Sequence, residues 1–141
     1  MISERDAMSE LEHAKRFSDL AVYRKAYQLA MDIFHLTKKF PKEEMYALTD
    51  QIRRSSRSIG AQIAEAWAKR RYEKSFISKL TDADGEQMET CHWLQTACDC
   101  GYIDVKQLLL LKTQSEEVGR MLAGMISKSN QFCGVISSTN H

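Results

Sequence analysis

The segment from residue 48 to residue 67 constrains the fold of this sequence more than any other part of it. Its apolar residues recur at steps of three and four, which is the spacing of one stripe along an α-helix. The stripe consists of Leu48, Ile52, Ile59, Ile63 and Ala66, and Ser55 fills its one gap. The segment therefore predicts an amphipathic helix that buries this stripe in a core.

The opposite face of the same helix lacks the lysines and glutamates of an ordinary solvent face. Its members are Arg53, Arg57, Ala61, Ala64 and Ala68. A helix with a core stripe on one side and small residues on the other can pack on both sides. We therefore predict an oligomer interface at Ala61, Ala64 and Ala68, formed with copies of the same chain or with a partner. Trp93, which lies off the apolar stripe of its own segment, is assigned to the same interface.

Three further segments show the same period, so the chain holds four long helices. Their expected bounds, with the helix described above as the second, are about 17–39, 42–69, 72–99 and 104–129. The expected inner faces are Tyr23, Ala26, Ala30, Ile33 and Thr37 in the first helix, Phe76, Leu80, Ala83, Gln87, Cys91, Leu94 and Cys98 in the third, and Leu108, Leu111, Val118, Leu122 and Met125 in the fourth.

Residues with special backbone preferences mark the ends of these helices. Ser18 or Asp19 can cap the first helix, because a short side-chain oxygen accepts an otherwise unpaired backbone N–H. Asp104 can cap the fourth helix in the same way. Pro41 suits the first turn of the second helix, since it lacks an N–H. Gly101 suits a left-handed stop at the C-terminal end of the third helix.

The connections between these segments are only a few residues long, and short links make sequential helices antiparallel. We therefore predict an all-α fold, an up-down-up-down antiparallel four-helix bundle. Residues 1–16 form a short N-terminal arm, residues 17–130 the bundle, and residues 131–141 a frayed tail rich in Ser, Gly and Asn. The length of 141 residues suits one domain of this kind.

Charge is unevenly distributed along the chain, although the net charge is only +1. Residues 53–79 hold eight basic side chains against two acidic ones, whereas residues 82–117 hold eight acidic side chains against two basic ones. This asymmetry has two interpretations. Either neighbouring helices complement each other's charge, or the basic part forms a binding surface on the assembled protein.

A run of basic residues lies where the second and third helices join, a position that is exposed in a bundle. The run consists of Lys69, Arg70, Arg71 and Lys74, with Tyr72 among them. Basic side chains with an interleaved aromatic ring suit a phosphate backbone with a stacked base, so we predict nucleic-acid binding here. Arg53 and Arg57 either contact phosphates as well or serve structural ion pairs. Arg54 is expected to neutralise Asp84 or Glu89 where these carboxylates are buried.

The sequence lacks the constellations that catalysis needs. It has no glycine-rich phosphate loop and no GxSxG motif. Glu89 and His92 have the Glu-x-x-His spacing of di-iron bundles, but such a site needs a second motif of the same kind. We therefore predict that the protein is not an enzyme and that it has no cofactor.

Cysteine usage and hydropathy bear on metal binding and location. The four cysteines, which form no CxxC pair and no zinc-ligand spacing, are Cys91, Cys98, Cys100 and Cys133. No apolar run approaches the roughly 20 residues needed to span a membrane, and residues 1–15 are polar and charged. We expect a cytoplasmic protein with reduced thiols, no metal and no membrane contact.

Several short motifs spread along the chain form a recognisable set. They are residues 17–22 (FSDLAV), 40–41 (FP), 46–48 (YAL), 51–54 (QIRR), 58–59 (SI), 63–65 (IAE), 89–90 (ET) and 101–103 (GYI), together with Phe76 and Gly85. Taken together, the motifs resemble the 23S rRNA intervening-sequence proteins over about residues 17–126. The resemblance implies a four-helix bundle that assembles into a ring-like homopentamer. Related accessory proteins of diversity-generating retroelements bind a reverse transcriptase and its RNA.

The residues and the resemblance lead to one function hypothesis and one alternative. The hypothesis is a non-enzymatic homo-oligomeric module, a pentamer by the resemblance, that binds RNA or a nucleic-acid enzyme such as a reverse transcriptase through basic surface. The alternative is a structural protein-interaction scaffold without nucleic-acid binding. A basic surface that includes Arg70 and Arg71 favours the first, whereas arginines that are neutralised within interfaces favour the second.

Overall fold

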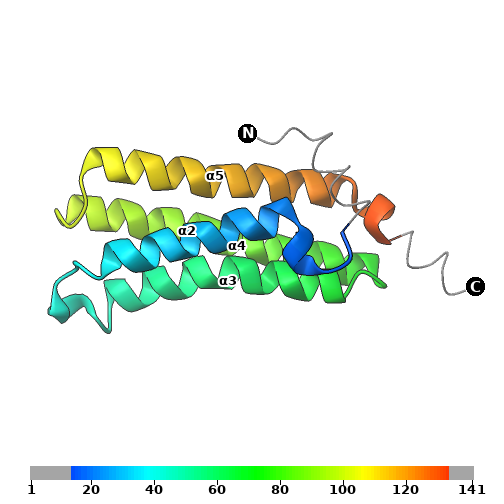
Figure 1. The fold of residues 1–141 in the computed structure, drawn as a ribbon, viewed down its shortest axis with the longest axis horizontal. Coiled ribbons are helices and arrows are strands. Elements are labelled where there is room, and N and C mark those ends of the chain that lie inside the picture. Colours follow the sequence, from blue (N-terminus) through cyan, green and yellow to red (C-terminus); the bar gives the residue numbers. More distant parts are fainter. Residues whose placement is uncertain (1–13, 134–141) are drawn as a thin grey trace, which may run out of the picture.

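The computed structural model describes residues 14–133, and this range contains helices and no strand (Figure 1). The four long helices are α2 (Ala21–Thr37), α3 (Leu48–Ala68), α4 (Glu73–Asp99) and α5 (Val105–Ser127), and two short 3₁₀ helices are η1 (Phe17–Asp19) and η2 (Lys42–Glu44). Each long helix packs antiparallel to the next, and α2 also packs against α5, which closes the bundle. The predicted up-down-up-down four-helix bundle is confirmed.

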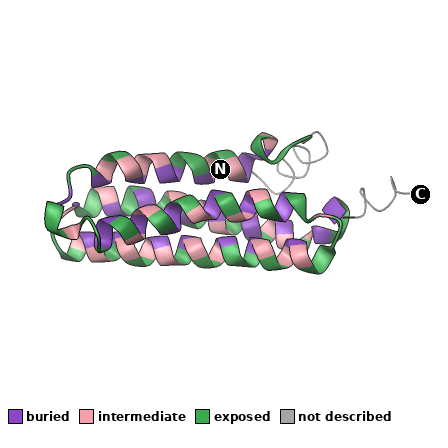
Figure 2. Ribbon diagram, turned by 90° about the horizontal axis from the view of Figure 1, so that it is seen from below, coloured by how far each residue is buried: buried purple, intermediate pink, exposed green. Residues whose placement is uncertain are grey.

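The core forms where the inner faces of the four helices meet (Figure 2). The predicted stripe of α3 is buried along its whole length, and Ile52, Ile59 and Ile63 have no exposed surface. A second line of α3 is buried as well, and Gly60 within it lies against the Tyr23 ring of α2. This line consists of Thr49, Ser56, Gly60 and Trp67. The back face of α3 is therefore narrower than the sequence pattern indicates.

A layer of polar side chains crosses the middle of this core. The Thr90 hydroxyl donates to the Ser55 hydroxyl at 3.0 Å, which links α4 to α3. The Ser115 hydroxyl donates to Oε1 of Gln87 at 2.9 Å, which links α5 to α4. Hydrogen bonds between buried groups hold one helix register, because a slipped register leaves these groups unpaired at a cost of about 1–3 kcal/mol each.

Gly119 of α5 makes room for this layer, and the two glycines of α5 offer a matched test of it. A Cβ atom added at Gly119 would lie 2.9 Å from Nε2 of Gln87, whereas one added at Gly124 would have no neighbour within 4 Å. Gly124→Ala is expected to raise the free energy of unfolding by about 0.5–1 kcal/mol through helix propensity. Gly119→Ala is expected to be less stable than that variant by about 1–2 kcal/mol, because Gln87 must give up hydrogen bonds. Urea denaturation of both variants checks this, and equal stabilities would contradict it.

Two of the predicted helix ends are as expected. The Asp104 carboxylate accepts a hydrogen bond from the backbone N–H of Gln107 at 2.7 Å and caps α5. Gly101 follows α4 with a φ of 81°, the left-handed conformation that glycine adopts without strain. The link between α4 and α5 is therefore specified by its own residues.

The starts of α2 and α3 differ from the predictions. Asp19 does not cap α2; its carboxylate accepts from the backbone N–H groups of Lys15 and Arg16 instead, at 3.0 and 3.2 Å. The helix expected from residue 42 begins only at Leu48, because η2 and a turn at Ala47 precede it. The physical reason is a long-range contact between Glu44 and Tyr102.

Glu44 fixes the turn that separates η2 from α3. The Tyr102 hydroxyl donates to Oε2 of Glu44 at 2.8 Å, and the backbone N–H of Leu48 donates to Oε1 at 3.4 Å. The hydrogen bond to this carboxylate raises the pKa of Tyr102 to about 12. Glu44 thus connects the turn to the link between α4 and α5. A continuous helix from residue 42 would move Glu44 and break its hydrogen bond with Tyr102.

The inner face of α4 and the end of the bundle also need correction. Cys91 and Cys98 are only half-buried, and Thr90 and Ala97 are fully buried in their place. The boundary expected at residue 130 lies too early, because Phe132 and Cys133 are buried as part of the core. The ring of Phe132 lies 5.6 Å from the ring of Phe76. The remaining tail, 134–141, and residues 1–13 of the expected arm lie outside the described residues.

Candidate assembly and nucleic-acid surfaces

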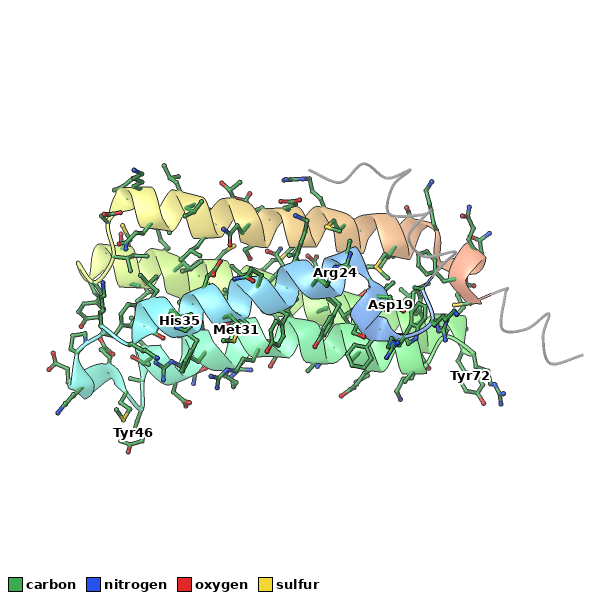
Figure 3. The ribbon with its side chains drawn as sticks, in the orientation of Figure 1. Asp19, Arg24, Met31, His35, Tyr46 and Tyr72 are labelled. Atoms are coloured by element: carbon green, nitrogen blue, oxygen red, sulfur yellow. The ribbon has the colours of Figure 1, made fainter. Side chains whose placement is uncertain are left out.

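An apolar groove runs along the outside of the bundle between α2 and α3, with a volume of about 410 Å³; we name it the α2–α3 groove. Its lining includes Phe17, Tyr23, Tyr27 and Met31 on one side and Gly60, Ala61 and Ala64 on the other. Figure 3 shows Met31 at the boundary between the two helices. The groove exposes aromatic and small apolar side chains to solvent, which is typical of a surface that another protein covers.

The small residues of α3 determine the shape of this groove. A Cβ atom at Gly60 would lie 3.4 Å from the Tyr23 ring, so the glycine allows the ring to approach the helix backbone closely. The Phe17 ring packs edge-on against Tyr23 with the ring centroids 4.9 Å apart. Tyr27 continues the aromatic row and has 56% of its surface exposed. Large side chains at Ala61 or Ala64 would fill the groove.

The structure brings together only half of the residues predicted for the oligomer interface. Ala61 and Ala64 both line the groove. Ala68 is exposed at the end of α3 and is not among the lining residues. Trp93 lies on α4 with a half-buried ring, and its indole N–H donates to Oε2 of Glu89 at 3.1 Å. The structure therefore places Ala61 and Ala64 in the groove and Ala68 and Trp93 outside it.

A second hollow of about 570 Å³ adjoins the groove near the start of α3; we name it the arginine hollow. Its lining includes Met45, Tyr46, Asp50, Arg53, Arg54 and Arg57. Arg53 donates from Nε to the Thr37 hydroxyl at 2.8 Å, and its guanidinium carbon lies 4.9 Å from the centre of the Phe34 ring. The guanidinium carbon of Arg57 lies 5.5 Å from the centre of the same ring, and Arg57 is exposed. Arg53 therefore joins α2 to α3, but through a hydroxyl and an aromatic ring and not through the ion pair that its structural interpretation expects.

Arg54, which also lines the arginine hollow, is neutralised within the chain. It forms ion pairs with Glu89 and, at 3.6 Å, with Glu86, both on α4. The pairing of Arg54 with Glu89 agrees with the sequence-based expectation, whereas Asp84 accepts a hydrogen bond from Gln87 instead. This part of the basic segment thus complements the acidic segment, and it joins α3 to α4.

The second predicted binding surface is the link between α3 and α4, residues 69–74, which we call the α3–α4 link. Lys69, Arg71 and Lys74 are exposed there, and Tyr72 has 63% of its surface exposed. Among the described residues these three cations form no ion pair within 4 Å. Figure 3 shows Tyr72 at one end of the bundle and Tyr46 at the other, with both side chains pointing away from the helices. The link therefore presents cations and an aromatic ring to solvent.

Arg70 is the exception in the link, and its predicted exposure is wrong. Its guanidinium carbon lies 3.4 Å from the centre of the Trp67 ring, and its Nε donates to the Trp67 carbonyl at 2.8 Å. Burial lowers the pKa of Arg70. Stacking on tryptophan is favourable for a guanidinium, so Arg70 covers the end of the core, and its role in phosphate binding stays a prediction.

The structure adds two negative observations for its described part. In residues 14–133 no group of three or more His, Cys, Asp or Glu side chains is placed to hold a metal ion. None of the helices described is both long and apolar enough to cross a membrane. The absence of a cofactor and of catalysis stays a prediction from the sequence.

Fold and surfaces define a class: an antiparallel four-helix bundle whose outer features are an apolar groove, an arginine-lined hollow and a basic link. The model of the family described as 23S rRNA-intervening sequence protein matches residues 18–124, and the chain belongs to that family. Among solved structures it is similar to a protein of unknown function from the S23 ribosomal protein family of Bacteroides thetaiotaomicron. The two are 33% identical, with 75% of this chain and 95% of that chain covered and a TM-score of 0.69. No curated protein matches the chain.

Sequence reasoning missed three residues that shape these surfaces. Tyr27 and Tyr46 are exposed aromatic residues next to the groove and the hollow, but single tyrosines carry no pattern that distinguishes them from core residues. The ring of Phe34 contacts a cation that follows α2 and a cation of α3, and Phe34 lies on the flank of the predicted stripe. The exposure of Tyr46 could be suspected only from its position next to the Phe-Pro break.

Proposed function

We propose that the protein is a non-enzymatic, cytoplasmic module that assembles with copies of itself and binds RNA, or a protein that acts on RNA such as a reverse transcriptase. Assembly uses the α2–α3 groove, and five copies is the number that the family resemblance implies. Binding uses the α3–α4 link, which each copy presents once. Repetition of a weak patch around an assembly raises the overall affinity without any new contact.

The observation that carries this proposal is the α2–α3 groove. Four large apolar or aromatic side chains and six small residues, together with Arg57, line a groove that is open to solvent in the single chain. Apolar patches of this kind on soluble proteins mark surfaces for partners. The matching small residues on α3 allow a helix of another copy to approach closely, which a face of lysines and glutamates would prevent.

The binding half of the proposal rests on the exposed cations of the link. Lys69, Arg71 and Lys74 surround Tyr72, and this combination suits a phosphate backbone with a base stacked on the ring. Nearby charge is already paired, because Lys79 and Glu65 form an ion pair at 2.9 Å that raises the pKa of Lys79 and lowers that of Glu65. Lys69, Arg71 and Lys74 form no ion pair among the described residues, so these three cations can bind an external anion.

A salt titration of RNA binding tests this half. Log affinity is expected to fall with log salt at a slope of about −0.7 per phosphate neutralised on a single strand. The double variant Arg71→Ala, Lys74→Ala should flatten that slope and weaken binding, because two phosphate contacts are lost in each copy. Fluorescence anisotropy with a labelled single-stranded RNA measures both quantities.

Lys106→Ala provides the control for that titration. Lys106 is exposed at the start of α5, which lies at the other end of the bundle from the α3–α4 link. This variant should keep the slope and affinity of the parent. Equal slopes for the parent and the double variant would remove the link from the binding surface.

Two observations favour the scaffold alternative and keep it as a second candidate. Arg70 stacks on Trp67, and Arg54 is paired with two glutamates, so two of the arginines serve contacts within the chain. If the parent protein binds no single-stranded RNA at low salt while it still assembles, the scaffold is the better account.

A further inference from the structure

Three cations gather around one aromatic ring where α2 meets α3. Lys38 Nζ lies 4.8 Å from the centre of the Phe34 ring, and the guanidinium carbons of Arg53 and Arg57 lie at 4.9 and 5.5 Å. We call Lys38, Arg53 and Arg57 the cation cluster. Like charges that gather at one ring repel each other, and Arg53 and Arg57 are also spaced i, i+4 on one helix, where like charges destabilise the helix.

The chain supplies little negative charge to offset this cluster. In residues 14–133 no carboxylate lies within ion-pair distance of Lys38, Arg53 or Arg57. The side chain of Arg53 donates a hydrogen bond to the hydroxyl of Thr37, which is neutral. Asp50 lines the same hollow as the two arginines and is exposed. Arg54 lines it too, but two glutamates neutralise it. The hollow thus sets two guanidinium groups against one carboxylate and carries a positive excess.

An aromatic ring stands at the rim of the same hollow. Tyr46 lines it and has 91% of its surface exposed. The turn that carries it is held in place, because Glu44 accepts hydrogen bonds from the Tyr102 hydroxyl and from the backbone N–H of Leu48. A tyrosine that is almost fully exposed on a fixed turn contributes nothing to the core, but it offers a flat face on which another ring can stack.

From this geometry we infer that the arginine hollow is a binding site for a nucleotide, with the phosphate on Arg53 and Arg57 and the base on Tyr46. Guanidinium groups bind phosphate oxygens through paired hydrogen bonds, and Arg53 keeps its two terminal nitrogens available while Nε is bonded to Thr37. Bases stack on tyrosine irrespective of sequence. The volume of about 570 Å³ is in the range of small-ligand sites.

A nucleotide fits the hollow better than other anions because it matches both features at once. A lone phosphate or a carboxylate peptide would use the arginines and leave the Tyr46 ring bare. The nucleotide is either free in solution or one unit of a single strand, and the chemistry of recognition is the same for both. The site is separate from the α3–α4 link, since the two lie at opposite ends of the bundle (Figure 3), so RNA binding at the link is tested independently of it. Arg57 and Ala61 line both the hollow and the α2–α3 groove, so the hollow adjoins the proposed assembly surface.

Photocrosslinking tests the inference on the full chain. The probes are 5-iodouridine monophosphate and a short 5-iodouridine-labelled oligouridine, and mass spectrometry maps the crosslinked residue. We expect a crosslink at Tyr46. The affinity for the probe that crosslinks should fall about tenfold in Tyr46→Ala, through lost stacking, and by a similar factor in Arg57→Gln, through lost phosphate contacts. Crosslinking by the monophosphate indicates a free nucleotide, and crosslinking by the oligonucleotide alone indicates a strand.

Two matched variants separate this site from general charge and from the link. Lys39→Gln removes an exposed cation next to the cluster and should leave the affinity unchanged, and Tyr72→Ala should leave the Tyr46 crosslink intact. Crosslinks at Tyr72 alone would overturn the inference and leave the link proposal standing. Equal affinity for uridine without phosphate, or equal competition by polyglutamate, would overturn it too. So would the absence of any crosslink, whether or not the link binds RNA in the salt titration.

Discussion

Ala64→Glu is expected to split the assembly into single chains. Ala64 lines the α2–α3 groove, where a neighbouring copy would bury the new carboxylate among apolar side chains, with Arg57 as the cation on the same lining. Taking a charge out of water costs several kcal/mol even when the charge is paired, and the longer side chain also fills the groove, so the association constant should fall by a factor of about 100 or more. Size-exclusion chromatography with light scattering at micromolar concentration measures the change.

Ala123→Glu is the matched control for that variant. Ala123 is exposed on α5 and is not among the residues of the groove. The control should keep the molar mass of the parent. Circular dichroism should show both variants folded, and an Ala64→Glu protein that is folded and still fully assembled would exclude the groove as the interface.

Phe76→Ala is expected to lower the free energy of unfolding strongly, because Phe76 is the largest of the fully buried side chains in the described part of the chain. The Phe76 side chain is fully buried and packs against Phe132. Removal of a buried phenylalanine ring costs about 3–5 kcal/mol, because transfer energy is lost and a cavity remains. Urea denaturation at fixed protein concentration measures this loss, and Phe76→Leu should give a smaller one if the alanine variant does not fold.

Tyr72→Ala and Phe132→Ala complete that experiment. Tyr72 is exposed a few residues before Phe76, so its removal should change stability by less than about 0.5 kcal/mol. Phe132→Ala should lower the free energy of unfolding by about 2 kcal/mol or more, because residue 132 belongs to the core. If Phe132→Ala were neutral, the bundle would end near residue 130, as the sequence suggests.

Much of the fold follows from local pattern, and particular residues show why. Ile52, Ile59 and Ile63 repeat with the helical period and are buried because that period places them on one side of α3. Gly101 and Asp104 act through their own backbone and side-chain chemistry, so their roles are visible without any knowledge of the neighbours. The presence of four long helices, the two helix ends at Gly101 and Asp104, and the topology were therefore predictable.

The misplaced features depend on contacts between distant parts of the chain. Nothing near Glu44 indicates that Tyr102 will bind it and separate η2 from α3. The burial of Phe132 depends on Phe76, and the placement of Arg70 depends on how the Trp67 ring is presented at the end of α3. Tertiary contacts decide such positions, and local propensity and charge alone do not.

The candidate surfaces were predictable only in part for the same reason. The alanines of α3 indicate a packed back face, and Ala61 and Ala64 do line a groove. The other wall of that groove includes Tyr23, Tyr27 and Met31 of α2. The sequence pattern places Tyr23 on the inner face of its helix, which is wrong, and Tyr27 and Met31 carry no signal of their own. The cation cluster likewise forms only where Lys38 of the turn after α2 meets the arginines of α3 around Phe34.

Native mass spectrometry of the unmodified protein tests the central claim most directly. The account predicts a closed homo-oligomer, with a principal species at five times the mass of one chain, at micromolar concentration and physiological salt. A closed ring should show this one species over a wide range of concentration, because heterologous contacts that close leave no free surface for growth. A single species at the mass of one chain would contradict the account.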